Sequence, residues 1–503
     1  MRVADLVAAL SSSSGASGAG ETAAVVGSLD REVTGIAYHS QKVRPGDLFA
    51  ALRGRAEDGH RYAGEAVRRG AAAVLVDHPL PELVVPQVVV PDTRRALAVL
   101  AAAFYGNPSR HLWLCGVTGT KGKTTTVSLI EAILRAAGNR TAVIGTLGVT
   151  ALGRPREFHA TTPTTPEAPD LQGLLSDLRA DGVERVVMEV TSHALELRRV
   201  DACRFRAAVF TNVTQDHLDF HGNVEQYRDT KSRLFAMVDP DGVCVINADD
   251  ASSSVMIGRS RARVWTYGVE RPADVRGEDL HLTLRGTRFT AVWPGGRLPL
   301  ALRLTGRFNV SNALAATALA LTQSVDPRVI RDALEGVSGI PGRFELVDEG
   351  QDFAVIVDYA HTPDSLEKVL RLAQEIGTAR RIVVFGCGGD RDRTKRPIMG
   401  RIATTCADYT IITSDNPRSE DPVAIIREIE TGAVGTGTFE TEPDRRRAIA
   451  RGIALARPGD VVVIAGKGHE TYQILGDRIV EFDDRQVARE ILRKKQGATR
   501  GST

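Results

Sequence analysis

The chain has 503 residues, and at about 150 residues per domain this length predicts two to four domains. Hydrophobic residues make up 43% of the chain and charged residues 25%, which is typical of a globular protein with substantial cores. The 64 basic and 62 acidic residues leave a formal charge of +2, so charge gives no reason to expect nucleic acid as the main partner.

The five cysteines lie far apart and form no Cys-x-x-Cys pair, which indicates reduced thiols rather than a disulfide framework or a zinc site. The N-terminus lacks the basic segment and apolar run of a signal peptide, and no apolar stretch approaches about 18 residues. We therefore expect a cytoplasmic protein without a membrane span.

The first part of the chain extends to about residue 108. Residues 11–20 are rich in Ser, Gly and Ala and predict a loop. Strands are expected at 73–76 and 88–90, and a helix over 94–105. The turn at Asn107-Pro108 marks the first boundary.

A phosphate loop follows in the second part. The apolar run 111–117 predicts a buried strand, and the pattern after residue 123 predicts a helix. Between them, Gly119-Thr-Lys-Gly-Lys-Thr124 fits G-x-x-x-x-G-K-[ST] except that Val117 occupies the first glycine position. Backbone N–H groups would surround phosphate oxygens, Lys123 would reach the terminal phosphates, and the Thr124 hydroxyl would ligate Mg²⁺. The alternative is a glycine-rich turn that binds nothing, but the strand–loop–helix context favours a nucleotide.

The rest of the second part alternates strands with helices. Its short apolar runs are typical of strands buried on both faces, at 143–144, 186–190, 207–213 and 243–246. Residues 279–304 predict antiparallel strands and 309–321 a helix, and Gly339-Ile-Pro-Gly342 marks the second boundary.

The third part repeats the α/β rhythm and ends in a polar tail, 493–503, that we expect to fray. Strands are predicted at 355–357, 382–385, 409–413 and 461–464, and polar motifs directly follow the last three of them. This pattern predicts a doubly wound sheet with functional loops at the carboxyl ends of its strands. The overall prediction is an α/β protein of three domains. They are a small N-terminal α/β substrate domain (1–108), a central P-loop ATPase-type parallel-sheet domain with an antiparallel addition (109–340), and a doubly wound Rossmann-like C-terminal domain (341–503).

Several polar residues at strand ends suit phosphate chemistry. Glu189 ends a strand near the phosphate loop and could hold Mg²⁺, although a solvated loop acid is the alternative. The cluster 212–221 could serve a metal or a phosphate, and within it a ligand role and a structural role for His217 remain equally open. Lys231 by itself indicates no function, because most isolated lysines on helices are solvated. Arg343 at a domain junction could neutralise a transferring phosphoryl group when the domains close.

Taken together, these motifs resemble the Mur ligase family, the ATP-dependent amide-bond formers of bacterial cell-wall synthesis. The resemblance covers nearly the whole chain and rests on five motifs in order: 119–124, 189–193, 211–217, 306–312 and 358–363. Five further segments are similar to the members that add diaminopimelate to the D-glutamate of UDP-N-acetylmuramoyl-L-alanyl-D-glutamate: 43–49, 161–166, 386–391, 415–418 and 466–470. The implied partners are small molecules, and the implied cofactors are ATP and Mg²⁺. Independently of the resemblance, we expect a monomer.

The resemblance also implies roles for individual residues. ATP would be bound by Gly119, Thr120, Lys121, Gly122, Lys123, Thr124, Thr125, Asn309, Asp358 and His361. The UDP-linked substrate would be bound by Ser40, Thr161, Thr162, Thr191 and Arg199. The incoming amino acid would be bound by Arg391, Asp415, Asn416, Pro417, Arg418, Gly466 and Glu470. The catalytic residues would be Lys123, His217, Lys231 and Arg343. Mg²⁺ would be held by Thr124, Glu189, His217 and a carbamylated Lys231.

Two departures and three alternatives accompany this interpretation. The family often has Asp-Ser-Arg where this chain has His39-Ser-Gln41, which weakens the expected uridine contacts, and Thr191 replaces a serine but keeps the hydroxyl. Arg418 favours diaminopimelate over L-lysine because it offers a bidentate partner for the distal carboxylate, while Glu470 offers one for the distal ammonium. L-lysine remains the alternative amino acid. A folylpolyglutamate-synthetase-like ligase, and a nucleotide-dependent switch or non-catalytic scaffold, are the alternative functions.

Overall fold

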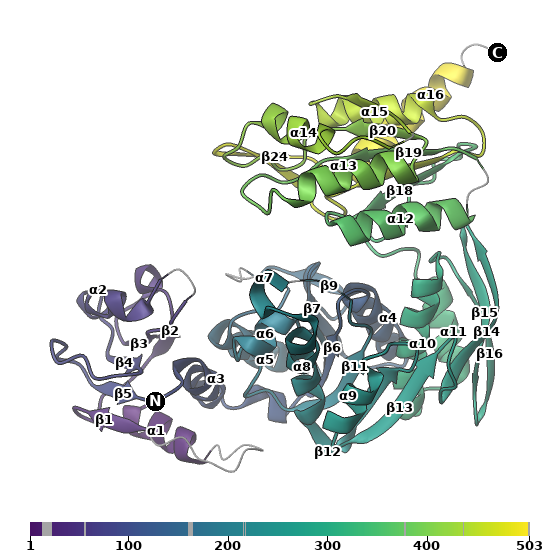
Figure 1. Ribbon diagram of the computed structural model, residues 1–503. Helices are drawn as coiled ribbons and strands as arrows, with labels where there is room; N and C mark the ends of the chain where they lie inside the picture. The colour runs from purple at the N-terminus through teal and green to yellow at the C-terminus, as the bar shows by residue number, and fades with distance from the viewer. Residues whose placement is uncertain are drawn as a thin grey trace. The chain divides into compact units, whose positions relative to one another are not determined.

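The computed structural model describes residues 1–12, 23–54, 57–158, 164–214, 216, 218–376, 379–435 and 437–500. The chain divides into two compact units. Unit 1 contains Met1–Gly277, Val292–Gly296 and Ser311–Ala333, and unit 2 contains Glu278–Ala291, Arg297–Val310 and Leu334–Thr503. Figure 1 labels the elements along the chain, and each unit is described by itself below.

The N-terminal part of unit 1 is a five-stranded sheet of order β1-β5-β4-β3-β2. Its strands are β1 (Ala24–Val26), β2 (Gly35–Ala37), β3 (Asp47–Ala50), β4 (Ala73–Val76) and β5 (Gln87–Val89), and its helices are α1 (Val3–Ser12), α2 (Ala63–Arg68) and α3 (Thr93–Phe104), with the 3₁₀ turns η1 (Ser40–Lys42) and η2 (Gly59–Tyr62). The expected strands and helix appear as β4, β5 and α3. The Asp92 side chain caps α3 by accepting from the N–H groups of Arg94 and Arg95. Ser11 and Ser12, expected in a loop, instead end α1 because Leu6 and Leu10 anchor it in the core, while residues 13–20 lie outside the described chain.

The central sheet of unit 1 carries the phosphate loop. After η3 (Pro108–Arg110), the strands are β6 (Trp113–Thr118), β7 (Thr141–Gly145), β8 (Gly148–Ala151), β9 (Arg154–Arg156), β10 (Arg185–Glu189), β11 (Phe205–Phe210), β12 (Val238–Asn247) and β13 (Arg263–Gly268), in the order β13-β12-β11-β6-β10-β7-β8-β9. The helices are α4 (Lys123–Ala136), α5 (Ala168–Ala180), α6 (Ser192–Glu196), α7 (Leu218–His221), α8 (Val224–Ala236) and α9 (Ser253–Arg259). β10, β6 and β11 run parallel with Glu189 opposite Val117 and Val117 opposite Val209, so their carboxyl ends coincide.

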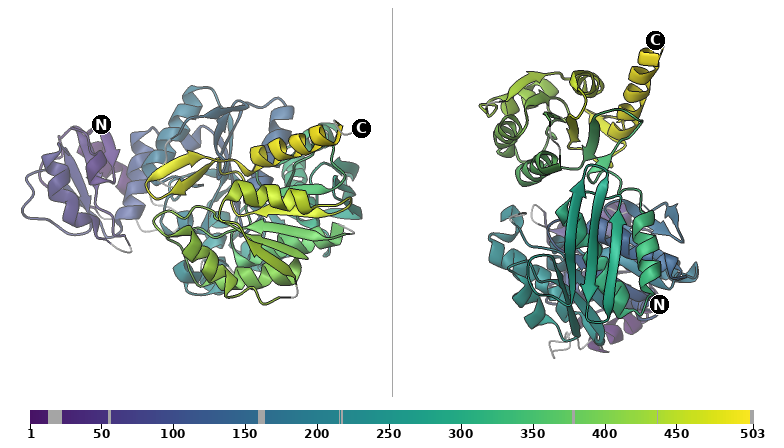
Figure 2. Two further views of the ribbon diagram at one scale, coloured as in Figure 1. Left: turned by 90° about the horizontal axis from the view of Figure 1, so that it is seen from above. Right: turned by 90° about the vertical axis from the view of Figure 1, so that its right-hand side faces the viewer.

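Three further strands follow: β14 (Val275–Thr283), β15 (Gly286–Trp293) and β16 (Gly296–Leu302). They are neighbours in the sheet order and lie side by side in Figure 2. Connections of two residues between them permit only antiparallel pairing, as expected for 279–304. The helices α10 (Arg307–Thr322) and α11 (Pro327–Gly336) come next, and α10 matches the helix expected at 309–321.

The C-terminal part of unit 2 is a six-stranded sheet of order β17-β18-β22-β19-β20-β21. Its strands are β17 (Glu345–Leu346), β18 (Ala354–Asp358), β19 (Arg381–Phe385), β20 (Tyr409–Ile412), β21 (Thr438–Thr441) and β22 (Val461–Ala465), with a hairpin of β23 (Tyr472–Leu475) and β24 (Arg478–Glu481). The helices are α12 (Pro363–Ile376), α13 (Lys395–Cys406), α14 (Pro422–Glu430), α15 (Arg445–Leu455) and α16 (Asp484–Arg500). The tail expected to fray therefore continues as helix through Arg500, since Leu492 anchors α16 in the core.

Alternating residues of the strands in the C-terminal sheet pack into two hydrophobic cores, one on each face of the sheet. Ile356, Val383 and Val463 pack with α12, α13 and α14 on one face, while Val355, Val384 and Val462 pack with α15 and α16 on the other. Figure 1 shows α15 and α16 on the opposite side of the sheet from α12 and α13. These strands are apolar throughout because both faces are covered, as predicted.

Two further expectations concern composition. The five cysteines form no disulfide in the structure, and four of them are buried. Within the described residues, no helix is both long and apolar enough to cross a membrane.

Candidate active site

The phosphate loop joins β6 to α4, and two glycines allow it to approach its neighbours closely. Gly122 has φ of +85°, and a Cβ there would lie 2.5 Å from Asn312 Oδ1. At Gly119 a Cβ would lie only 1.8 Å from Thr211 Oγ1. A side chain at either position would push the loop away from the residues that support it.

The residues after β11 hold the phosphate loop by several hydrogen bonds. Thr120 N–H donates to Asn212 O at 2.8 Å, and Lys121 N–H donates to Asn212 Oδ1 at 3.0 Å. Thr211 Oγ1 and Asn212 Nδ2 both donate to Lys121 O, at 2.7 and 3.1 Å. Hydrogen bonds within the protein therefore support the loop, and Asn212 is a supporting residue for which no individual role was predicted.

Two lysines meet at Gly119. Lys123 Nζ donates to the carbonyl oxygens of Gly119 and Thr120, at 2.9 and 3.0 Å. Lys231 Nζ also donates to Gly119 O, at 2.9 Å, from a side chain that is 1% exposed. Burial and the charge of Lys123 lower the pKa of Lys231 well below its usual value, against a smaller opposing effect of Asp216.

Tyr227 connects Lys231 to the loop, although no role of its own was predicted for it. Its hydroxyl lies 3.2 Å from Thr120 Oγ1, and its ring centroid lies 4.4 Å from Lys231 Nζ. The available signal was the spacing Tyr227-x-x-x-Lys231 in α8, which places both side chains on one helical face.

Glu189 is a buried carboxylate at the end of β10. Its side chain accepts from Thr146 N–H at 2.9 Å and from Thr146 Oγ1 at 3.1 Å, and the residue is 1% exposed. Among the described residues no ion pair involves Glu189. The alternative of a solvated loop acid is therefore wrong, because burial removes the carboxylate from water.

His217, Thr161 and Thr162 lie outside the described residues, so their predicted roles are untested. Beside His217, Asp216 forms an ion pair with Lys121 at 3.7 Å.

The described residues expected to bind the UDP-linked substrate fall into two groups. Thr191 caps α6 and lies 3.3 Å from Thr165 Oγ1, and Arg199 donates to Thr165 O at 3.0 Å, so Thr165 joins these two residues. Arg199 also pairs with the buried Glu167 at 2.8 Å. Ser40 lies instead in η1 of the N-terminal sheet, where it donates to Glu65 at 3.1 Å.

Four predicted ATP-binding or catalytic residues belong to unit 2. Asp358 ends β18 and accepts from Phe344 N–H at 2.7 Å, and the Arg343 guanidinium lies 4.9 Å from the ring centroid of Tyr359. His361 Nδ1 lies 2.7 Å from Tyr359 O, and Asn309 Nδ2 donates to Thr305 O at 2.8 Å. Arg343, Asp358 and His361 thus flank Tyr359.

The residues expected to bind the amino acid follow neighbouring strands of the C-terminal sheet. Phe385 lies opposite Ile412 and Ala465 in the parallel pairings, so the motifs after β19, β20 and β22 share one edge. Asn416 Nδ2 donates to Glu470 Oε2 at 2.8 Å, and a Cβ at Gly466 would lie 2.6 Å from Asp415 Oδ2. The structure therefore brings Asp415, Asn416, Gly466 and Glu470 together.

The two arginines of this group are held by backbone carbonyls. Arg418 has φ of +52° and donates through Nη1 to Gly389 O at 2.7 Å, and Pro417 precedes it in the same turn. Arg391 is exposed and donates to Asp390 O at 2.9 Å.

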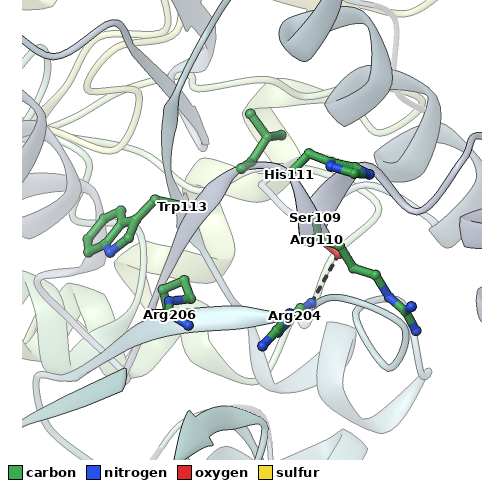
Figure 3. A pocket seen from close by; sticks show the side chains of 7 residues that line it. Ser109, Arg110, His111, Trp113, Arg204 and Arg206 are labelled. Atoms are coloured by element: carbon green, nitrogen blue, oxygen red, sulfur yellow. Dashed lines mark hydrogen bonds between the residues drawn. The ribbon is translucent and has the colours of Figure 1, made fainter. Parts of the chain in front are cut away.

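One cavity of about 220 Å³ lies away from all these residues. It is lined by Ser109, Arg110, His111, Leu112, Trp113, Arg204 and Arg206, and Arg204 N–H donates to Ser109 Oγ within it (Figure 3). Trp113 begins β6, whereas the phosphate loop follows the other end of that strand. Its position at the amino ends of the strands separates this cavity from the nucleotide chemistry.

His60, Asp77 and His78 form a cluster of possible metal ligands that was not predicted from the sequence. Their ligand atoms lie within 4.8 Å of one another. His60 Nδ1 lies 2.6 Å from Asp58 Oδ1, and His60 Nε2 accepts from Asp77 N–H at 3.1 Å. Both ring nitrogens are thus engaged, and Arg53 pairs with Asp77, so we assign the group a structural role.

Comparison with known proteins connects these features. The profile of the Mur ligase middle domain matches residues 117–320, that of the Mur ligase glutamate ligase domain matches 342–468, and that of the Mur ligase family catalytic domain matches 32–105. The UDP-N-acetylmuramoyl-L-alanyl-D-glutamate–2,6-diaminopimelate ligase of Syntrophomonas wolfei is 49% identical over 474 residues, which cover 93% of this chain and 96% of that protein.

Two solved structures are also similar. A UDP-N-acetylmuramoyl-L-alanyl-D-glutamate–2,6-diaminopimelate ligase superposes with a TM-score of 0.68 at 34% identity, covering 93% of this chain and 97% of the other. A MurF ligase from Thermotoga maritima in complex with ADP gives 0.60 at 20% identity, covering 92% and 98%. The second likeness is one of fold alone.

Proposed function

The chain belongs to the Mur ligase family, and we propose that it adds 2,6-diaminopimelate to UDP-N-acetylmuramoyl-L-alanyl-D-glutamate with conversion of ATP to ADP and phosphate. This reaction belongs to the synthesis of peptidoglycan precursors. The identity of 49% to a ligase of that name over 93% of the chain carries the proposal. The phosphate loop, held by hydrogen bonds to Thr211 and Asn212, supports the use of ATP.

The proposed chemistry explains why cations gather at the phosphate loop. A carboxylate oxygen of the D-glutamyl residue attacks the γ-phosphorus of ATP, and the bond from that phosphorus to the ADP oxygen breaks. Several negative charges meet during this step, and Lys123 and Arg343 would offset their repulsion. Lys123 Nζ donates to the carbonyl oxygens of Gly119 and Thr120, which places this cation at the loop where the phosphates would bind.

The second step forms the amide. The neutral amine of diaminopimelate attacks the acyl carbon, the tetrahedral intermediate expels phosphate, and the amine nitrogen loses a proton. An acyl phosphate hydrolyses in water, so exclusion of water from the reacting groups would protect it. Asp415, Asn416, Arg418 and Glu470 would hold the amino acid through its charged ends.

The residues around Glu189 fit the Mg²⁺ that this family implies. A carboxylate 1% exposed, without an ion-pair partner in the described chain, is a hard oxygen ligand whose charge requires compensation. Thr124, Glu189, His217 and Lys231 would hold the ion. When bound, Mg²⁺ would neutralise charge on the phosphate oxygens.

Carbamylation would convert Lys231 into a suitable ligand. Only a neutral amine reacts with CO₂, and burial keeps Lys231 neutral in a larger fraction of molecules than an exposed lysine. The product, an N6-carboxylysine, carries a negative charge and would be an oxygen ligand in place of a cation.

Other parts of the proposal concern the molecule as a whole. We propose a cytoplasmic monomer without a nucleic-acid partner, with domains near 1–108, 109–340 and 341–503. The folate alternative is disfavoured because residues 32–105, which match a Mur ligase profile, would not be expected in a folylpolyglutamate-synthetase-like ligase. Intact Lys123, Thr124, Glu189 and Lys231 disfavour a switch or scaffold.

A screen of amino acids against UDP-N-acetylmuramoyl-L-alanyl-D-glutamate and ATP tests the function, with product mass as the readout. We expect a product with diaminopimelate and a catalytic efficiency at least about thirtyfold lower with L-lysine, since Arg418 would then lack its carboxylate partner. Arg418→Ala should narrow this difference. Equal efficiency with both amino acids would contradict the choice of diaminopimelate, and ATP hydrolysis without any amide product would contradict the ligase function.

A further inference from the structure

Lys467 lies in the segment 466–470 and contacts two of the predicted amino-acid-binding residues, although no individual role was predicted for it. Its side chain is fully buried, in the loop between β22 and β23. Its Nζ lies 3.2 Å from Glu470 Oε2 and 3.4 Å from Asn416 Oδ1, and it also donates to the carbonyl oxygen of Tyr472. These three acceptors use the full donor capacity of an ammonium group.

Asn416 and Glu470, two of the residues that accept from Lys467, are also linked directly to each other. Asn416 Nδ2 donates to Glu470 Oε2 at 2.8 Å, and Asn416 Oδ1 accepts from Ile474 N–H at 3.0 Å. Glu470 Oε2 therefore receives one hydrogen bond from an amide and one from a cation. This leaves Glu470 Oε1 for a ligand, because no described residue donates to it.

The geometry points to Lys467 as a specificity-determining residue. We propose that it fixes Glu470 and Asn416 and cancels one of the two carboxylate charges of the site, so that the site accepts diaminopimelate but not L-lysine. This inference rests on the proposed function and concerns the same site.

The preference for diaminopimelate follows from the charges of the site and of the two amino acids. Among the predicted amino-acid-binding residues and Lys467, Asp415 and Glu470 supply two negative charges and Arg391, Arg418 and Lys467 supply three positive ones, so this set of residues carries an excess of one positive charge. Diaminopimelate has two carboxylates and two amino groups and is neutral overall, whereas L-lysine carries a net positive charge. Glu470, already paired with Lys467, has less capacity to attract the single side-chain ammonium of L-lysine, and Arg418 has no carboxylate to bind.

Removing the charge of Lys467 should therefore favour the wrong substrate. Lys467→Met keeps the length of the side chain and leaves the Glu470 carboxylate without its cation. We expect catalytic efficiency with diaminopimelate to fall at least about tenfold through KM, and the ratio between diaminopimelate and L-lysine to narrow at least about tenfold. The KM for ATP should stay within about twofold. Lys467→Arg keeps the charge and should retain most of the wild-type preference.

The double variant Lys467→Met/Glu470→Gln separates charge from packing. It removes one charge of each sign, so the excess positive charge returns and L-lysine should again be rejected, although diaminopimelate loses the partner of its distal ammonium. Thermal unfolding checks that each variant is folded. If Lys467→Met alone does not fold, the substrate preference of the double variant still tests whether charge balance sets the choice of amino acid.

The outcomes distinguish this inference from the function on which it rests. A wild-type protein that forms no amide with diaminopimelate would overturn both. An active wild type together with a folded Lys467→Met variant that keeps the wild-type substrate ratio would overturn the role of Lys467 alone. A double variant that prefers L-lysine would also overturn it, because charge balance would then not set the preference.

Discussion

At the scale of single residues, burial decides what each ionisable group can do. Lys231 and Glu189 are each 1% exposed, yet one lies against a carbonyl and the other against a threonine. Neither has a full countercharge in the described chain, an arrangement that is costly unless a ligand or a modification supplies one. Buried charges of this kind indicate function more strongly than exposed charges do.

Replacing Lys231 tests whether its carbamate takes part in catalysis. Lys231→Ala should lower ligation by at least about a hundredfold, because no carboxylate would remain at that position. Lys231→Arg should be equally inactive, since a guanidinium does not form the carbamate. Short carboxylates added to Lys231→Ala should restore part of the activity, and ¹³C-labelled bicarbonate should give a carbamate signal only in the wild type. Full activity of Lys231→Ala without additives would contradict the role.

His469 should make the stability of the protein depend on pH. Burial, together with the positive charges of its neighbours, lowers the pKa of this histidine to about 4; the neighbours are Arg343, Arg485, Lys467 and His361. The unfolded chain has a histidine pKa of about 6.5, so the unfolded state binds the extra proton between these values. The contribution of His469 is thus fully present above pH 6.5 and is lost as the pH falls toward 4.

We expect the wild type to lose on the order of 1–2 kcal/mol more unfolding free energy than His469→Gln between pH 7 and pH 5. Urea titrations of both proteins at the two pH values measure this difference. Identical losses would show that His469 takes up a proton in the folded protein as readily as in the unfolded chain.

At the scale of elements, the same residue type has different roles at the two ends of one helix. Gly122 precedes α4 and Gly138 follows it, and both have φ of +85°. A Cβ at Gly122 would meet Asn312 at 2.5 Å, whereas a Cβ at Gly138 would meet nothing within 4 Å. An alanine would therefore suffer the same backbone strain at Gly122 and Gly138, and only at Gly122 would its Cβ also clash with Asn312.

Alanine at these two positions separates strain from displacement of the phosphate loop. Gly138→Ala should cost about 1 kcal/mol of stability, as expected for a side chain at positive φ, and should leave ATP affinity unchanged. Gly122→Ala should in addition weaken ATP binding by about tenfold or more, since the loop must move away from Asn312. Calorimetric titration with a non-hydrolysable ATP analogue measures the affinities. Equal affinities would show that the loop tolerates the displacement.

A buried ion pair connects α15 and α16 to the ends of two strands. Arg445 donates to Asp484 at 2.8 and 2.7 Å, with both side chains 0% exposed, and it also donates to Ser414 O and Ala465 O. These carbonyls directly precede Asp415 and Gly466. The pair therefore supports the amino-acid site from behind.

Breaking this pair should be costly. Arg445→Met should lower the unfolding free energy by about 3–5 kcal/mol, because Asp484 would be left buried and unpaired. Arg446→Met is the matched control in the next position of α15, where the pair with Glu490 is half exposed, and it should cost less than about 1 kcal/mol. Chemical denaturation of the three proteins compares them. Similar losses of unfolding free energy in both variants would mean that, without Arg445, Asp484 is hydrated or forms an ion pair with another residue.

At the scale of the whole molecule, the residues to which we assign catalytic roles belong to both units of the chain. Lys123 and Glu189 belong to unit 1, whereas Arg343 belongs to unit 2. Phosphoryl transfer is catalysed mainly by positioning and charge, so a cation supplied by a separate unit can be essential for turnover without being needed to bind the nucleotide.

Two variants test this division. Arg343→Ala should lower ligation at least about a thousandfold while ADP still raises the melting temperature, whereas Lys123→Ala should lose most of that stabilisation. Arg371→Ala, which removes an exposed arginine of unit 2 paired within α12, is the control and should be fully active. Activity of Arg343→Ala within tenfold of the wild type would confine the catalytic residues to unit 1.

The sequence alone determined the features that depend on local pattern. Continuous apolar runs identified β4, β10, β19 and β22, because strands buried on both faces must be apolar throughout. Short or half-exposed strands such as β1, β21 and β24 lack that signal, and they were missed. The order of the motifs indicated the Mur ligase family, since glycines and polar residues at strand ends are needed wherever phosphates bind.

Only the tertiary structure showed which distant residues support the sites. Asn212, which follows β11, and Tyr227 in α8 both contact the phosphate loop. Lys467 contacts Asn416, and Arg445 donates to the carbonyl oxygen of Ala465, so both support the amino-acid site from distant positions in the chain. No local pattern predicts such contacts, because a polar side chain has the same sequence signature whether it faces water or a buried partner. What decides between them is burial, which depends on how the strands are ordered in the sheet and which helices cover its faces.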